Sequence, residues 1–370
     1  MWFSCESGIT TILRSRLATI ATLMLNADLA PALAFQERSL QAVSRTFALT
    51  IPRLPQGLRE PVGNGYLLCR IADTIEDDPE LSWSEKARWQ EAFVAVVQGR
   101  AEPDAFARDF AAVLSPQMPA GERELIRNTP LVIQVTRSFN ATQQEALARC
   151  VAIMGSGMAK FQEQASRAGL ADLAALDSYC YVVAGVVGEM LTTLFIDYEP
   201  RLVVREADMQ RLAVRFGQGL QMTNILKDFW TDWERGVNWL PRDLLARHGV
   251  DVAALAPGQD NPAFQHALLE LVAIAGRHLD AALRYTLMIP REQTGMRDFC
   301  LWAIAMAVLT LRRIAAQPAF QRAEQVKISR DSVRRVVWMS QLLHRSDELL
   351  RLAFRVGVRP LPQINGGVPA

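Results

Sequence analysis

The sequence predicts an all-α protein built as a single large helical domain. Apolar residues recur at three- and four-residue steps in nearly every long segment, and no period-two alternation persists. The breaks between these segments have the Pro, Gly or Asp chemistry of turns and helix starts. Half of the 370 residues are hydrophobic, and no repeat, low-complexity linker or shift in composition divides the chain. We therefore expect one domain with a large core.

The helix boundaries follow from these breaks. They fall at Pro52–Gly57, Pro79–Trp83, Gln117–Gly121, Pro200, Pro241, Ala256–Pro262, Pro290–Gly295 and Pro318. We expect residues 36–358 to form the domain, after an N-terminal extension over residues 1–35. Residues 359–370 are rich in Pro and Gly and are expected to form a disordered tail.

Charge and cysteine usage exclude several classes of function. Lys plus Arg number 40 against 39 Asp plus Glu, so the formal charge is +1 and the basic excess of a nucleic-acid-binding protein is missing. The five cysteines form no CxxC pair, and the four histidines have no metal-ligand spacing. A zinc site and a disulfide framework are therefore not expected. We expect reduced thiols in a cytoplasmic protein, and we expect that protein to be a monomer.

Membrane signals in the sequence are weak. No uninterrupted apolar run approaches the ~18 residues of a spanning helix. Near the N-terminus, Arg14 and Arg16 lie inside an apolar stretch that runs to Met24, whereas a signal peptide places its charge before the apolar run. Ala32-Leu33-Ala34 resembles a cleavage site, so a signal peptide stays the less favoured alternative. A peripheral membrane helix and a frayed extension are both compatible with this segment.

The first feature with chemical meaning is a run of acidic residues before Pro79. Asp73, Glu76 and Asp77 stand at helical spacing, so their carboxylates share one face. Such crowding of like charge destabilises a helix unless a cation neutralises it. Oxygen-only ligands favour a hard cation, and Mg²⁺ typically combines one or two carboxylates with substrate phosphates. The plainer alternative is a solvated, acidic helix end.

A second polar stripe lies on a later, apolar helix. Gln221, Asn224, Asp228 and Asp232 follow one another at three- and four-residue steps. Burying such groups among apolar neighbours costs free energy unless they have partners, although a solvated face is also possible. If the two acidic helices face each other, they form a double magnesium clamp for diphosphates. Arg45 and Arg70 lie near this clamp, and the planar arginine fork suits phosphate oxygens.

The order and spacing of four motifs resemble the squalene/phytoene synthase family over roughly residues 36–345. The four motifs are Ser44-Arg45-Thr46-Phe47, Tyr66 to Asp78, Tyr179 to Gly188, and Gln221 to Asp232. Two further stretches resemble the squalene branch, Phe299 to Ala307 and Val326-Lys327-Ile328-Ser329. The chain departs from that branch at Ala303-Ile304, where Pro-Gln is usual, and at Val237, where a basic residue is usual.

The resemblance implies a helical isoprenoid synthase fold with a central cavity, and a role for each matching residue. Asp73, Glu76, Asp77, Asn224, Asp228 and Asp232 would hold Mg²⁺. Ser44, Arg45, Tyr66 and Arg70 would bind or orient the diphosphates, together with Gln221 and Asn224. Tyr179 would lie beside the first carbocation and assist departure of the diphosphate, and Phe299 would stabilise later cations. Lys327, with Asn224, is the candidate contact for NADPH.

The resemblance also implies a reaction. Two farnesyl diphosphates would join as presqualene diphosphate, and hydride from NADPH would then give squalene. The nearest alternative is a dehydrosqualene or phytoene synthase, which uses no NADPH and in the phytoene case takes geranylgeranyl diphosphate. A non-catalytic assembly or binding relative is more remote, because both acidic motifs stand complete. A terpene cyclase is disfavoured, because its second metal motif is spaced differently from Asn224, Asp228 and Asp232.

Overall fold

The computed structural model describes residues 29–44 and 46–363, and every regular element in this part of the chain is helical. The one departure is an isolated parallel bridge between Leu170 and Pro241. A helix covers residues 29–43. The elements that follow are α2 (Phe47–Thr50), η1 (Ile51–Arg53), α3 (Arg59–Asp77), α4 (Trp83–Val97), α5 (Pro103–Val113), α6 (Ala120–Arg127), α7 (Thr129–Arg137), α8 (Ala141–Gln164), α9 (Leu173–Cys180), η2 (Tyr181–Gly185), α10 (Val186–Tyr198), η3 (Pro200–Arg205), α11 (Glu206–Glu234), α12 (Arg242–Arg247), η4 (Val252–Ala254), α13 (Pro262–Met288), α14 (Thr294–Ala316), α15 (Ala323–Val326), α16 (Arg330–Leu343) and α17 (Asp347–Val358).

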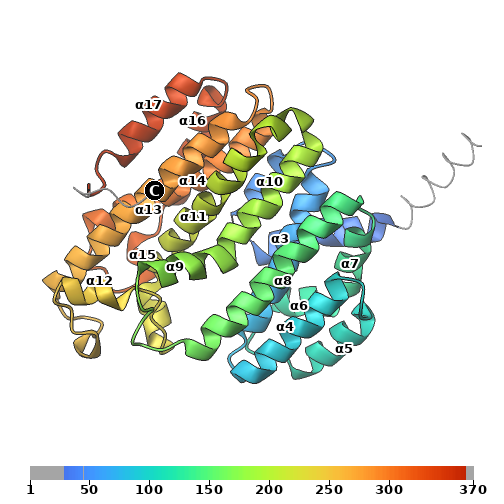
Figure 1. Ribbon diagram of the computed structural model, residues 1–370, viewed down its shortest axis with the longest axis horizontal. Coiled ribbons are helices and arrows are strands. Elements are labelled where there is room, and N and C mark those ends of the chain that lie inside the picture. Colours follow the sequence, from blue (N-terminus) through green and yellow to red (C-terminus); the bar gives the residue numbers. More distant parts are fainter. Residues whose placement is uncertain (1–28, 45, 364–370) are drawn as a thin grey trace, which may run out of the picture.

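The long helices form a continuous packed series. Helix α8 packs on α3 and α10, α10 on α11, α11 on α13, and α13 on α14 (Figure 1). The shorter helices α4 to α7 cover the α3 and α8 side, whereas α16 and α17 cover α14 at the opposite edge. The predicted all-α fold is confirmed.

The core consists of two large hydrophobic clusters. One is centred on α3, α8 and α10, and the other on α11, α13 and α14. Val183 in η2 and Phe216 in α11 pack against both clusters and remain partly accessible. The two cores therefore meet along η2 and α11. Of the predicted site residues, Gln221 lies on α11, and Tyr179 lies at the end of α9, two residues before η2.

Glycines allow η2 and α10 to approach α11 very closely. A Cβ atom at Gly188 would collide with the backbone oxygen of Ala213, and one at Gly217 with that of Ala184. At both positions two backbones are in direct contact, so any larger residue would force the helices apart. The Gly185–Gly188 part of the third motif thus sets the position of the second acidic helix.

The predicted helix breaks coincide with observed helix ends. Helix α10 ends before Pro200, α13 before Pro290 and α14 before Pro318, as expected where a proline cannot continue the helix. Several breaks without proline were missed, including the starts of α8 and α17. There Asn140 accepts a hydrogen bond from the amide of Gln143 (2.9 Å), and Ser346 accepts one from Leu349 (3.3 Å). These are ordinary N-caps, which the sequence could have signalled.

Two helical stretches are long and apolar enough to cross a membrane by composition, namely residues Leu173–Tyr198 and Thr294–Ala316. The share of each apolar window that is buried inside the structure is 44% and 56%. Core helices of soluble proteins can have the same length and composition, so these two helices are weak evidence for a membrane span. The predicted extension 1–35 lies mostly outside the described residues, as does the tail after residue 363. Within the predicted tail, Leu361 is buried in the second core cluster.

Candidate active site

Arg70 organises the first acidic motif at the end of α3. Its guanidinium makes an ion pair with Glu122 of α6, and lies 3.7 Å from the Asp73 carboxylate and 3.9 Å from that of Asp77. Arg70 stands one turn before Asp73, so the helix itself aligns these groups. The Nε atom of Arg70 is buried without a hydrogen-bond partner among the described residues. One donor of this arginine is therefore left for a ligand.

The two carboxylates on the inner face of α3 are strongly perturbed. Burial raises the pKa of Asp73 to about 8, against the opposing effect of Arg70 and with the help of Glu76 and Asp77. Burial likewise raises the pKa of Glu76 to about 7, although Gln162 of α8 donates a hydrogen bond to its Oε1 at 2.6 Å. Both carboxyls therefore lie where the protein alone does not stabilise their charge, which is the environment a cation would relieve.

Asp78, the last residue of the motif, has a structural task. Its side chain is fully buried and accepts hydrogen bonds from the backbone amides of Ser115 (2.8 Å) and Glu80 (2.9 Å). These bonds fix the chain where it leaves α3. The residue therefore closes the helix end and takes no part in the clamp.

The second acidic motif lies on α11 and faces the first. Burial and the neighbouring Asp228 raise the pKa of Asp232 to about 6, and the charge of Asp77 across the site contributes to this rise. Asp232 in turn contributes to the raised pKa of Glu76. The Asp228 carboxylate lies 3.1 Å from the ammonium of Lys227. The carboxylates of Glu76 and Asp77 on α3 therefore lie close enough to Asp232 on α11 to interact electrostatically. The two helices form opposite walls of one site.

Arg235 also links the two acidic helices. Its Nη1 lies 4.0 Å from an oxygen of Asp77, although it belongs to the end of α11. Val237 stands where the family that the sequence resembles usually has a basic residue. Arg235, just before Gly236, supplies a positive charge close to that position.

Tyr179 lies between the two acidic walls. Its ring stacks on Trp239 with centroids 4.1 Å apart and planes 9° apart, and meets Phe161 edge-on at 5.2 Å. Burial first, then the charges of Glu76 and Asp232, raise the pKa of its hydroxyl well above the usual value. The phenol therefore keeps its proton and can donate a hydrogen bond into the site.

Three aromatic residues, Phe47, Tyr66 and Phe299, form a cluster on the same side of the site as Arg70. The Phe47 ring lies 5.1 Å from Tyr66 and 6.3 Å from Phe299, and the Tyr66 hydroxyl donates to the carbonyl of Val43 at 3.2 Å. The Ser44 hydroxyl accepts a hydrogen bond from the Phe47 amide at 2.9 Å. Burial raises the pKa of Tyr66, and Ser44, Arg70 and Asp73 also influence it. Arg45 lies outside the described residues.

The remaining predicted residues are less closely tied to the site. Gln221 is half-buried and Asn224 exposed on the α11 stripe that leads to Asp228. Lys327 is exposed just after α15, a helix that packs on α11 and α14. No contact joins Lys327 to another predicted site residue within the described part of the chain.

Sequence reasoning missed several supporting residues. Gln162 and Lys86 hold Glu76, since the Lys86 ammonium donates to its backbone carbonyl at 2.5 Å. Glu122 pairs with Arg70, and Trp239 supports the Tyr179 ring. All four lie outside the motifs: Lys86, Glu122 and Gln162 on α4, α6 and α8, and Trp239 in the segment between α11 and α12. Only the tertiary packing reveals their roles, because no local spacing distinguishes them.

The donor set fits magnesium better than a transition metal. Carboxylates and the Asn224 amide offer only oxygen ligands, which hard cations prefer. Among the described residues, no three His, Cys, Asp or Glu side chains are gathered into a ready metal site. A magnesium ion held by one wall would therefore need oxygens from elsewhere, and diphosphate supplies them.

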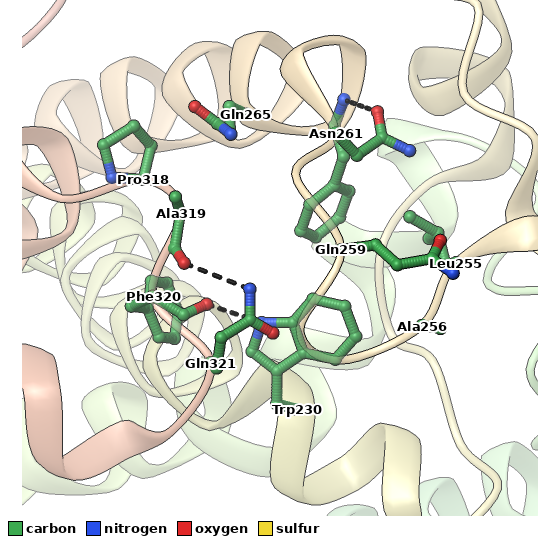
Figure 2. Close-up of a pocket in the computed structure, with 11 residues that line it drawn as sticks. Trp230, Leu255, Ala256, Gln259, Asn261, Gln265, Pro318, Ala319, Phe320 and Gln321 are labelled. Atoms are coloured by element: carbon green, nitrogen blue, oxygen red, sulfur yellow. Dashed lines mark hydrogen bonds between the residues drawn. The ribbon is translucent and has the colours of Figure 1, made fainter.

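A small pocket lies near α11 but apart from these residues (Figure 2). Trp230, Phe264 and Phe320 line it with several side-chain amides, and the Trp230 indole donates to the Phe320 carbonyl at 2.8 Å. At about 10 Å³ it has room for one water molecule. None of the predicted site residues lines it.

Comparison with known proteins gives one consistent family. A family model described as squalene/phytoene synthase matches residues 40–332. Squalene synthase ERG9 of Gibberella zeae is 28% identical over 314 residues, which cover 81% of this chain and 62% of that protein. A squalene synthase of Botryococcus braunii is 31% identical over 288 residues, covering 76% and 57%. The human squalene synthase is 27% identical over 274 residues, covering 74% and 61%. The chain thus spans about 60% of the length of these relatives.

Solved structures agree on the architecture. A complex of TcSQS with the ligand BPH1237 has a TM-score of 0.73 at 25% identity, covering 91% of this chain and 94% of that one. A dehydrosqualene synthase in complex with a ligand has a TM-score of 0.65 at 20% identity, covering 87% and 99%, and supports the fold alone.

Proposed function

Because the chain belongs to the squalene/phytoene synthase family, we propose that it joins two farnesyl diphosphates head to head, through presqualene diphosphate, to squalene. The observation that carries the proposal is the electrostatic contact between the two helices: the charge of Asp77 raises the pKa of Asp232, and the charge of Asp232 raises the pKa of Glu76. Two acidic helices that face each other around a buried tyrosine are suited to hold two diphosphates.

Mg²⁺ would be held by Asp73, Glu76 and Asp77 on one wall and by Asn224, Asp228 and Asp232 on the other. When bound, the metal stabilises the negative charge of a departing diphosphate. The raised pKa values of Asp73 and Glu76 support this assignment, because a nearby cation would restore their ionised forms.

Arg70, together with Ser44, Tyr66 and Gln221, would bind the diphosphates. The Nε atom of Arg70 is buried and has no hydrogen-bond partner among the described residues, so one donor of this arginine is left unsatisfied by the protein. Ser44 and Tyr66 lie on the same side, and Gln221 extends the α11 stripe. Arg45 remains a predicted contact. An arginine donor stabilises a leaving group most where charge develops in the transition state.

Tyr179 would serve the first ionisation. Its protonated hydroxyl can donate a hydrogen bond to a departing oxygen, and the aromatic rings around it exclude water. The Trp239 stack holds the phenol in place. Phe47, Tyr66 and Phe299 offer ring faces to later cations, an attraction of roughly 0.5–2 kcal/mol each.

The reductive step is the finer part of the proposal. NADPH would supply hydride, and Lys327 is the candidate contact for its phosphate, with Asn224 as a second candidate contact for the cofactor. The exposed ammonium of Lys327 suits an anionic cofactor. A dehydrosqualene synthase, which omits this step, is the second candidate, and Ala303-Ile304 in place of the usual Pro-Gln favours it.

We further propose a cytoplasmic, monomeric enzyme that binds no nucleic acid. Its net charge of +1 supports the last point. Membrane contact through the N-terminal segment stays a prediction, since residues 1–28 lie outside the described part of the chain.

The test is product analysis. The full chain is incubated with farnesyl diphosphate and Mg²⁺, with and without NADPH, and the hydrocarbon is identified by mass. Squalene that forms only with NADPH supports the proposal. Dehydrosqualene regardless of NADPH, or product only from geranylgeranyl diphosphate, would assign the chain to the second candidate. The absence of any condensed product would reject both.

A further inference from the structure

Exposed apolar side chains concentrate on the two last helices. Of the eleven large hydrophobic residues exposed in the described part of the chain, six lie on α16 and α17. Trp338 is 61% exposed, Leu342 59%, Leu352 50% and Val356 63%. Soluble monomers seldom gather such residues unless the surface binds something.

These residues form one stripe on each helix. Trp338, Met339 and Leu342 stand at helical spacing on α16, and Leu349, Leu352 and Val356 do so on α17. The two helices contact each other at the outer edge of the molecule (Figure 1). We call these six residues the outer stripes.

The opposite faces of both helices are firmly attached to the domain. The Trp302 indole of α14 donates to the Ser340 hydroxyl of α16 at 2.5 Å. In α17, Leu350 is buried, and Asp347 pairs with the fully buried Arg297 at 2.8 Å. Each helix therefore packs on the domain through its inner face. The outer stripes take no part in this packing.

The charge around the outer stripes is strongly positive. Residues 330–359 carry seven arginines and three acidic residues, although the whole chain has a net charge of only +1. All seven arginines are exposed. Within the described residues, no ion pair neutralises Arg345, Arg351, Arg355 or Arg359. Asp347 already forms ion pairs with Arg291 and Arg297, so it does not neutralise these four arginines.

We propose that the outer stripes and their arginines dock the protein peripherally on an anionic membrane surface. Apolar stripes beside a basic rim are the composition of helices that lie in a lipid interface. At 14 and 12 residues, α16 and α17 are too short to span a bilayer. A second copy of the chain fits poorly, because a two-fold contact would bring two arginine-rich faces together.

The proposal goes beyond the proposed function and is tested without turnover. The full chain is mixed with vesicles of phosphatidylcholine alone, or of equal parts phosphatidylcholine and phosphatidylglycerol, and bound protein is measured by flotation. We expect binding to the anionic vesicles, weakened by salt. Binding to neither vesicle, or equal binding to both, would overturn the proposal.

Variants locate the contact. Trp338→Ser combined with Leu342→Ser should weaken partition at least about tenfold, since both apolar side chains would leave the interface. Arg351→Gln combined with Arg355→Gln should weaken it about 25-fold, at about fivefold for each arginine near an anionic surface. Trp83→Ser is the matched control, because Trp83 is 55% exposed on α4. It should bind as the unaltered chain does.

Three results would contradict this assignment. The Trp338/Leu342 variant could bind as tightly as the unaltered chain, or Trp83→Ser could weaken binding equally. Alternatively, size-exclusion chromatography could reveal a dimer that the same double variant converts to monomer, with no vesicle binding by either. The outer stripes would then be an interface between copies. Each of these results leaves the catalytic proposal unaffected.

Discussion

The hydrogen bond from Gln162 to Glu76 offers a sharp test of how the first acidic wall is tuned. Replacing Gln162 with Met keeps a side chain of similar size and removes the amide donor that lies 2.6 Å from the Glu76 carboxylate. That donor lowers the pKa of Glu76, which burial otherwise raises to about 7. The variant should therefore have a higher pKa at this carboxyl.

The magnitude follows from the strength of such a bond. A hydrogen bond to a charged group contributes about 1.5–3 kcal/mol, and one pKa unit corresponds to about 1.4 kcal/mol. Glu76 is only half-buried, so we take the lower figure, a rise of about one unit. At pH 7 the ionised fraction would fall from about a half to about a tenth. Apparent Mg²⁺ affinity should then fall about fivefold at pH 7, since the ion requires the ionised ligand.

The assay is the Mg²⁺ dependence of turnover at pH 7 and again at about pH 9. At the higher pH both proteins are mostly ionised at Glu76, so the difference should nearly vanish. Gln164→Met, at an exposed position on the same helix end, is the control and should match the unaltered chain at both pH values. A loss of affinity that persists unchanged at the higher pH would refute the reasoning and indicate a structural defect.

Two further predictions concern stability. Arg297→Met should cost about 3–5 kcal/mol in urea unfolding, because it removes a buried guanidinium that pairs with Asp347 and donates to the carbonyls of Ile289 and His344. The exposed Arg313→Met on the same helix should change stability by less than about 0.5 kcal/mol, and equal effects of the two variants would contradict this. Hydrogen bonds, chiefly from Arg201, lower the pKa of Glu199 from 4.5 to about 2, so its stabilisation is complete above pH 4.5 and is lost as the pH falls toward 2. Glu199→Gln should therefore lower Tm most above pH 4.5, and a Tm difference that grows on acidification would reverse the assigned sign.

The local patterns predicted the helices and the acidic faces well. Asp73, Glu76 and Asp77 share a face because helical spacing requires it, and the prolines at 200, 290 and 318 stop helices because they lack an amide donor. Starts that depend on a single cap, such as Asn140 before α8, were missed although the signal was present.

What the sequence could not predict is pairing across the fold. That Gln162 holds Glu76, that Glu122 holds Arg70 and that Trp239 supports Tyr179 depends on how distant helices pack. Asp78 illustrates the opposite case: it belongs to the acidic motif by sequence, yet its carboxylate is used to fix the Ser115 backbone. A motif therefore predicts which residue types are present, whereas the tertiary packing determines which groups each of them contacts.

The central claim is that two facing acidic helices act together on one pair of diphosphates. The most direct test compares condensed product from farnesyl diphosphate and Mg²⁺ for the unaltered chain, Asp73→Asn and Asp228→Asn, with helix content followed by circular dichroism. We predict that each variant keeps its helix content and loses at least about 100-fold of its turnover, because either wall alone fails to stabilise the departing charge. Near-normal turnover by either folded variant would contradict the account.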